Sequence, residues 1–268
     1  MTPQGTDVYT YDPASNRLLS ITGPHPKTYA YDAVGNVMSD GTNRFVYDGR
    51  GRLIRVPNAQ GMTQYRINGL GQRVAKLRGT ASGQSGSYFV YDEAGHLLGE
   101  YTLQGQAVQE TVYLGDMPVA VLKDDTHFFV YADHLNTPRA IADTRGTVVW
   151  RWDSDPFGAT LPNEDPDGNG TNFTYNLRFP GQYFDQETGL VYNYFRYYDP
   201  QIGRYIQPDS LGLQGGINPY VYVSHSPINF VDPTGQNNGI VSKPVQKLVG
   251  KLTLFQGISQ VLRHHKTT

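Results

Sequence analysis

Residues 178–236 read RFPGQYFDQETGLVYNYFRYYDPQIGRYIQPDSLGLQGGINPYVYVSHSPINFVDPTGQ, and this stretch decides the fold. Its aromatic residues favour strands, whereas Gly, Pro and Asp recur every few positions and favour tight turns. The whole chain of 268 residues has the same character, with 30 Gly, 17 Pro, 20 Tyr and only 17% charged residues. The sequence therefore predicts an all-β protein built from many short strands.

A unit recurs upstream of this stretch: two aromatic residues two positions apart, then Asp, two variable residues, Gly and an apolar pair. Clear copies begin at Tyr9, Tyr29, Phe45 and Phe89, and weaker copies begin at Tyr65, Tyr113 and Phe129. Aromatic side chains at i and i+2 lie on one face of a strand, Asp opens a turn and Gly takes a positive φ, so each copy predicts a β-hairpin. In the first copy Asn16 holds the Gly position, and Asn also tolerates the left-handed region. Because one hairpin is only marginally stable, we expect a continuous antiparallel sheet that curls and buries its Tyr-rich face.

The repeated unit resembles the YD repeat, and residues 178–236 resemble the Rhs-associated core, so the chain is identified as a member of the Rhs/YD-repeat family. The run Asp133-His-Leu-Asn-Thr-Pro138 and the run from Trp150 to Gly158 are similar to family segments as well. The resemblance implies a partial shell of hairpins over residues 7–153, a variable polar insertion at 154–177, the core at 178–236 and a variable basic tail with a short helix at 237–268. Seven hairpins are few for a closed shell, so we expect an open sheet edge and either a truncated protein or the last part of a larger one.

Composition limits the remaining possibilities. The absence of Cys excludes disulfides and thiolate metal sites. Neither a bilayer-spanning apolar run nor a signal peptide is visible, so only the family suggests a location, which is secretion from a bacterium or display on its surface. The net charge of −2 hides an asymmetry, because residues 237–268 contain five bases and no acids while the rest contains 17 bases and 24 acids. The body is therefore not expected to bind nucleic acid.

Two aspartates of the core are candidates for chemistry, namely Asp209 in Pro-Asp-Ser-Leu-Gly and Asp232 in Val-Asp-Pro-Thr-Gly. From the residues alone, both are turn aspartates of the Asp-x-x-Gly type. The resemblance instead implies an intramolecular aspartyl-protease pair assisted by Arg196, which cuts the chain between Gln236 and Asn237. Two neighbouring carboxyls cannot both ionise cheaply, so one keeps a proton and acts as the acid while the other activates water. No cofactor is needed for that reaction.

Two residues depart from the family pattern at this site. Gln236 stands where Leu usually precedes the cut, and Ser210 stands where Pro usually follows the first aspartate. Neither change removes a carboxylate, but both affect how the scissile segment docks. The hypothesis of an intramolecular aspartyl autoprotease and that of an uncut chain therefore both stay open.

Three further sets of polar residues invite a catalytic or metal-binding interpretation. Asp133 and His134 lack a nearby nucleophile or second ligand, so a turn is favoured. Asp165, Asp167 and Asn169 match the first half of a calcium loop, but Asn176 replaces the expected Glu at the twelfth position, which favours an ordinary acidic turn. The adjacent His264 and His265 point apart on a helix and do not suggest a metal site.

These observations favour the carrier and cap portion of a bacterial polymorphic toxin. The implied partners are the chain's own C-terminal segment, a preceding Rhs shell, secretion machinery and an immunity protein. The tail has an imperfect basic amphipathic pattern, which fits a helix packed on the shell, a toxin remnant or a helix on a membrane surface. The alternatives are a YD-repeat module that binds carbohydrate or protein, and an inactive remnant of an Rhs protein.

Overall fold

The structure, a computed structural model, describes residues 5–59, 61–80 and 83–236. Within these ranges the regular elements are twenty β-strands and two short 3₁₀ segments, η1 (Gly212–Gly215) and η2 (Val223–His225). The all-β prediction is therefore confirmed. The expected C-terminal helix and the candidates His264 and His265 lie outside the described residues.

The strands form four antiparallel sheets. The first two sheets consist of β1 (Val8–Tyr11), β2 (Leu18–Thr22) and β3 (Lys27–Thr28), and of β4 (Ala30–Tyr31) and β5 (Val37–Ser39). The main sheet runs in sequence order through β6 (Val46–Tyr47), β7 (Leu53–Asn58), β8 (Gly61–Ile67), β9 (Arg73–Thr80), β10 (Gly83–Tyr91), β11 (Leu97–Thr102), β12 (Ala107–Leu114), β13 (Met117–Lys123), β14 (Thr126–Ala132), β15 (Pro138–Ala142) and β16 (Val148–Arg151). The core sheet consists of β17 (Tyr183–Asp185), β18 (Leu190–Asn193), β19 (Arg196–Asp199) and β20 (Arg204–Tyr205).

The predicted continuous sheet is thus found from β6 to β16, and it stays open because these two strands are its opposite edges. It differs from the prediction at the N-terminal end, where the first hairpins form separate small sheets. One physical reason lies at β5: the backbone N–H of Val37 donates to the carbonyl of Ile206 in the core, 2.9 Å away, instead of to a neighbouring hairpin.

The hairpin turns have the predicted chemistry. In one copy the carbonyl oxygen of Asp92 accepts the N–H of Gly95 at 3.1 Å, and its carboxylate Oδ1 accepts the N–H of His96 at 2.8 Å. Gly95 has a φ of 89°, a conformation that favours glycine. Asn16 and Asn136 take the same place with φ values of 56° and 64°, so the predicted exchange of Gly for Asn is confirmed at Asn16.

The second aromatic residue of the unit ties successive hairpins together. Its hydroxyl donates to a backbone carbonyl at the start of the preceding hairpin's returning strand, in the pairs Tyr31 to Leu18 at 2.8 Å, Tyr47 to Val37 at 2.7 Å and Tyr91 to Arg73 at 3.1 Å. A phenylalanine at this position would leave a half-buried carbonyl without that donor. The bond explains why the unit ends on Tyr before the turn.

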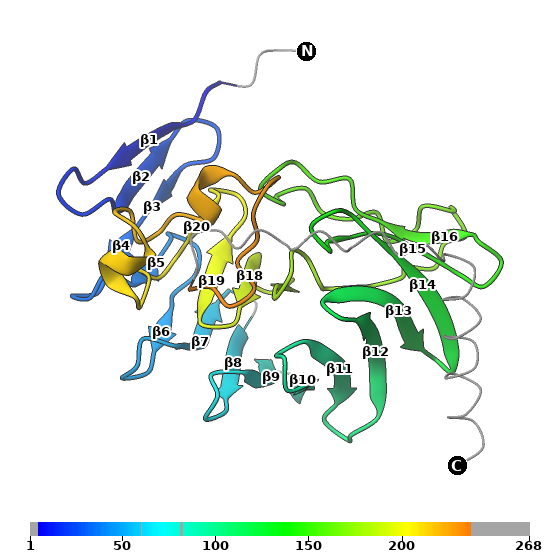
Figure 1. Ribbon diagram of the computed structural model, residues 1–268. Helices are drawn as coiled ribbons and strands as arrows, with labels where there is room; N and C mark the ends of the chain where they lie inside the picture. The colour runs from blue at the N-terminus through cyan, green and yellow to red at the C-terminus, as the bar shows by residue number, and fades with distance from the viewer. Residues whose placement is uncertain (1–4, 60, 81–82, 237–268) are drawn as a thin grey trace.

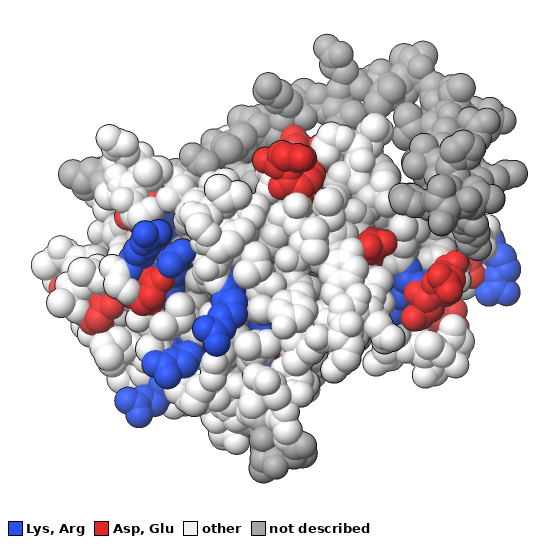
Figure 2. Space-filling model, turned by 90° about the horizontal axis from the view of Figure 1, so that it is seen from below, with Lys and Arg blue, Asp and Glu red and all other residues white. Residues whose placement is uncertain are grey.

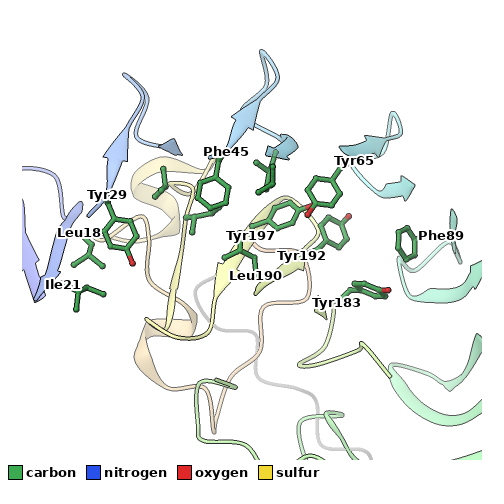
Figure 3. Packing of buried hydrophobic residues seen from close by; sticks show 14 residues of the cluster. Leu18, Ile21, Tyr29, Phe45, Tyr65, Phe89, Tyr183, Leu190, Tyr192 and Tyr197 are labelled. Carbon is green, nitrogen blue, oxygen red and sulfur yellow. The ribbon is translucent and has the colours of Figure 1, made fainter. Parts of the chain in front are cut away.

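The core sheet lies inside the curve of the main sheet (Figure 1), and every residue of β18 and β19 is buried. One face carries Tyr183, Leu190, Tyr192 and Tyr197, which pack against Phe45, Tyr65 and Phe89 of the repeats (Figure 3). The other face carries Val191, Tyr198 and Tyr205, which belong to a cluster with Ile141 and Trp150 of β15 and β16. The closing segment therefore packs against the inner face of the curled sheet.

Charged side chains lie in separate groups on the face drawn in Figure 2, and uncharged surface separates them. Neither positively nor negatively charged side chains cover the whole of this face. Among the described residues, no helix has the length and apolar character that crossing a membrane requires.

Candidate functional site

Arg196 is placed by the hairpin that joins β18 to β19. Asn193 pairs with Arg196 in register, and the two residues between them form a tight turn in which Tyr194 has a φ of 55°. The N–H of Phe195 in this turn donates to the carbonyl of Thr234 at 3.1 Å. Since both faces of the hairpin are covered, the guanidinium of Arg196 lies in the interior, and its side chain is only 3% exposed.

Asp209 begins a turn four residues after β20. Its N–H donates to the carbonyl of Pro219 at 2.9 Å, and its Oδ1 accepts the N–H of Leu211 at 2.8 Å. Gly215 of η1 packs directly on the carboxyl, because a Cβ at that position would lie 2.6 Å from Asp209 Cγ. The loop after Asp209 therefore folds back over the side chain and shields it from water.

Asp232 begins the Asp-Pro-Thr-Gly loop, which we call the Asp232 loop (residues 232–236). Its backbone passes against Gly181, where a Cβ would lie 1.9 Å from the carbonyl oxygen of Pro233. It also passes against the β18–β19 hairpin, where a Cβ on Gly235 would lie 2.3 Å from the carbonyl oxygen of Asn193. Glycine is required at both places, since Gly181 and Gly235 also have φ values of 80° and 70°.

The three predicted site residues meet at one guanidinium nitrogen. Nη2 of Arg196 lies 3.0 Å from Asp209 Oδ2 and 3.4 Å from Asp232 Oδ2. Nη1 of the same residue donates to the carbonyl of Pro219 at 3.0 Å, and Nε donates to the carbonyl of Gly235. Arg196 thus contacts both carboxyls and the backbone of the Asp232 loop at the same time.

Burial separates these aspartates from the turn aspartates of the repeats. Both make the backbone bonds of a turn, so the turn interpretation is also satisfied locally. However, the side chains of Asp209 and Asp232 are 1% and 0% exposed, whereas those of Asp48 and Asp143 in repeat turns are 21% and 14% exposed. A turn alone does not require two buried carboxyls on one cation, because burying charge is costly unless it is paired.

Two further polar residues complete the cluster and were missed from the sequence. The hydroxyl of Tyr205 donates to Asp232 Oδ2 at 2.8 Å, and Asn193 Nδ2 donates to that hydroxyl at 2.7 Å. Burial and the adjacent Asp232 hold the pKa of Tyr205 well above its ordinary value, so the phenol keeps its proton and stays a donor. The guanidinium carbon of Arg196 lies 3.6 Å from the centroid of the same ring. Tyr205 is one of 20 tyrosines and carries no sequence signal of its own.

The residue before the expected cut is held at two points. The backbone N–H of Gln236 donates to Asp232 Oδ1 at 3.1 Å, and its side-chain Nε2 donates to Ser210 Oγ at 2.9 Å. Asn237, on the other side of the expected cut, lies outside the described residues. The two positions that depart from the family pattern therefore contact each other.

The other polar candidates are engaged in local structure. His134 Nε2 lies 3.0 Å from the carbonyl oxygen of Ile228, as expected for a loop support. The two carboxylate oxygens of Asp165 accept the backbone N–H groups of Asn169 and Gly170 at 2.9 and 3.0 Å, and Asn169 Nδ2 donates to Asp167 Oδ2 at 2.9 Å. Within the described ranges, no group of three or more acidic, His or Cys residues is arranged to hold a metal ion.

Comparison with known proteins places the chain in a family. The chain is 30% identical to the toxin protein Tse5 of Pseudomonas aeruginosa over 83% of its own length and 19% of the relative's. It is 29% identical to the double-stranded DNA deaminase toxin A of Burkholderia cenocepacia over 95% of its own length and 22% of the relative's. The chain therefore spans about a fifth of the length of these relatives.

Solved structures support the same fold. A crystal structure of TcdB2-TccC3 matches with a TM-score of 0.62 at 21% identity, over 86% of this chain and 14% of that one. The family model Teneurin YD-shell matches residues 3–219, a span that includes Arg196 and Asp209 and ends before Asp232. The chain belongs to the YD-shell family of Rhs/YD-repeat proteins, which includes bacterial toxins.

Proposed function

We propose that this chain is the carrier and cap portion of a bacterial polymorphic toxin and that it cuts its own backbone after Gln236. Asp209 and Asp232 act as the acid and base, and Arg196 holds both to the Asp232 loop. The observation that carries the proposal is the contact of one buried guanidinium with both carboxyls and with the carbonyl of Gly235, one peptide bond before the proposed cut.

The charge of the cluster supports an acid and base pair. Two ionised carboxylates beside one guanidinium carry a net negative charge, and the side chains of all three residues are at most 3% exposed. Burying a net charge is costly, and a pair of neighbouring carboxyls of which one is protonated carries less charge than a pair of carboxylates. One carboxyl is then an acid and the other a base, which is the arrangement that peptide hydrolysis by two aspartates needs.

The reaction follows from this arrangement. The ionised carboxylate takes a proton from a water molecule, whose oxygen attacks the carbonyl carbon of Gln236, while the protonated carboxyl gives its proton to the carbonyl oxygen. When the tetrahedral intermediate collapses, the bond to the nitrogen of Asn237 breaks, that nitrogen takes the proton held by the base, and one hydroxyl of the intermediate returns its proton to the carboxylate that had acted as the acid. A carboxylic acid forms at Gln236. Arg196 positions the loop through the carbonyl of Gly235, and Tyr205 positions Asp232.

Intact mass of the full-length chain tests the proposal. We expect the parent to yield a body that ends at Gln236, and the Asp232→Asn and Asp209→Asn variants to stay whole. Asp143→Asn is the matched control, because Asp143 makes the same kind of turn on the surface and its loss leaves the cluster intact. An uncut parent, or a parent and an Asp232→Asn variant cut alike, would refute the assigned chemistry.

A cavity of about 840 Å³ favours a second candidate function, the binding of a carbohydrate. Its lining includes Tyr113, Tyr192 and Tyr194 together with Asp92 and His96. Ring faces beside a few polar groups are what a small polar ligand requires of such a pocket. Binding of a glycan by the full-length chain on an array, lost in a Tyr113→Ala variant, would support this function, and an array without bound glycan would contradict it.

A further inference from the structure

Ser210 and Gln236 each lie close in sequence to one of the two site aspartates, and their side chains contact each other. Ser210 comes directly after Asp209, and Gln236 ends the loop that Asp232 begins. The carboxamide Nε2 of Gln236 donates to Ser210 Oγ at 2.9 Å, across 26 positions of sequence. No local turn rule places these two side chains together, so the contact is a property of the assembled site.

The same glutamine is fixed through its backbone. Its N–H donates to Asp232 Oδ1 at 3.1 Å, and the preceding carbonyl, of Gly235, accepts from Arg196 Nε. The backbone of Gln236 is therefore held from the Asp232 side and its side chain from the Asp209 side. These two attachments restrict the conformations that Gln236 adopts, and holding a reacting group in fewer conformations raises the rate of attack on it.

The chemistry of the contact is selective. A serine hydroxyl has two lone pairs and accepts a hydrogen bond from an amide N–H, whereas an aliphatic side chain at position 236 offers no donor. A proline at position 210 would offer no acceptor on its side chain. Hydroxyl at 210 and carboxamide at 236 are thus complementary, and changing one member alone removes the bond.

We propose that Ser210 is the specificity-determining residue for self-cleavage, and that its hydroxyl selects a hydrogen-bond donor in the side chain at position 236. This inference rests on the proposed function, because it concerns the same peptide bond. On this inference the two departures from the family pattern, Ser210 and Gln236, compensate each other, because each supplies the hydrogen-bonding partner of the other. Ser210 acts as a positioning residue, since it contacts the side chain beside the cut and not the reacting atoms.

A double-mutant cycle on the full-length chain tests the inference. The parent, Ser210→Ala, Gln236→Met and the double variant are made by cell-free synthesis, and the cut fraction is followed over time by mass. Met resembles Gln in length but donates no hydrogen bond. We expect each single variant to be cut about three to ten times more slowly, the range that loss of one hydrogen bond gives. Ser210→Ala should have no further effect in the Gln236→Met background, and Ser210→Thr, which keeps the hydroxyl, should be cut like the parent.

The possible results separate the inference from the proposed function. If the parent is cut and Ser210→Ala is cut at the same rate, the inference is overturned and self-cleavage stands. If the parent stays whole while Ser210→Pro/Gln236→Leu is cut, the aspartates are competent but the Ser210 and Gln236 pair obstructs them, which also overturns the inference. If both stay whole, the proposed function fails and the selection by Ser210 fails with it. Equal melting temperatures for the parent and Ser210→Ala would show that a slower cut does not come from unfolding.

Discussion

Replacing Asp185 by Asn should be among the most destabilising single changes in this protein. Asp185 lies on β17 of the core sheet and Arg73 on β9 of the main sheet, and Arg73 Nη1 lies 2.5 Å from Asp185 Oδ2. The side chain of Arg73 is 1% exposed and that of Asp185 is 0% exposed. Tyr65 donates to the same oxygen at 2.9 Å, and Lys76 Nζ lies 3.4 Å from Oδ1. The pair therefore fastens the repeats to the core in the centre of the molecule.

The magnitude follows from what the variant leaves behind. The Arg73 guanidinium lies among five aromatic rings, at 4.4 to 6.0 Å from their centroids, and water does not reach it. Removing one partner of a buried ion pair costs about 3–5 kcal/mol, because the other charge stays buried without compensation. With a urea slope of about 2 kcal/mol per molar, the unfolding midpoint should fall by roughly 1.5–2.5 M.

Urea unfolding followed by the fluorescence of the buried Trp150 and Trp152 measures this change. Asp143→Asn is the matched control, because it removes a carboxylate from an exposed pair with Arg145, and such pairs contribute at most about 1 kcal/mol. A loss below about 1 kcal/mol in Asp185→Asn would refute the reasoning, since it would mean that Arg73 finds water or another anion in the unfastened interior.

The dependence of stability on pH also involves the ion pair of Asp185 and Arg73. Burial acts to raise the pKa of Asp185, but the charges of Arg73 and Lys76 outweigh it and hold the pKa below its ordinary value. The stability that this carboxylate contributes is therefore fully present above the ordinary range near pH 4, and it is lost as the pH falls through the lowered pKa.

Three further predictions concern other parts of the fold. Asp199→Asn should match or exceed the parent in stability at pH 7 and lose this advantage near pH 4. The reason is that burial raises the pKa of Asp199, so the contribution of this carboxyl to stability is lost as the pH rises through the raised pKa. Urea midpoints at both pH values check this, and a variant much less stable than the parent at pH 7 would contradict it. Gly181→Ala should lower the free energy of unfolding by more than about 3 kcal/mol and block the proposed cut. Gly105→Ala is the control, because Gly105 has a similar φ of 83° but open space around it, and it should lower the free energy of unfolding by only about 1–2 kcal/mol. Equal melting temperatures for the two variants would contradict the packing argument. Tyr47→Phe should cost about 1 kcal/mol and Tyr131→Phe, whose residue is 52% exposed, almost nothing; thermal unfolding compares them, and equal losses would argue against the inter-repeat bond.

The local chemistry of the repeats could be predicted from the sequence because it acts within a few residues. Asp92 and Gly95 make their turn through hydrogen bonds between residues close together in the chain. Asn16 adopts the left-handed region because its own short polar side chain tolerates that conformation. The hydroxyl of Tyr47 was not predicted, since its acceptor belongs to another hairpin.

Long-range placement could not be predicted from one sequence by such local rules. Arg73 and Asp185 are separated by 112 positions, and neither has a neighbouring motif that indicates the other. The site shows the same limit from another direction. Asp209 and Asp232 obey the Asp-x-x-Gly turn rule that repeat aspartates also obey, so the sequence alone does not separate them from ordinary turns. Their burial on Arg196 does, and burial is decided by the packing of the whole core.

This packing has a consequence for the order of events in the proposed reaction. Arg196 contacts both aspartates in a structure in which the β18–β19 hairpin is covered on its two faces, by Tyr65 and Phe89 on one side and by the cluster of Trp150 on the other. We expect a chain that lacks one of these layers to admit water to the cluster, and the carboxyls and Arg196 would then lose the arrangement that the proposed reaction needs. Self-cleavage would then follow folding, and it would release the C-terminal segment only from a body that is already assembled. A destabilised variant such as Asp185→Asn should accordingly be cut less at urea concentrations that leave the parent folded.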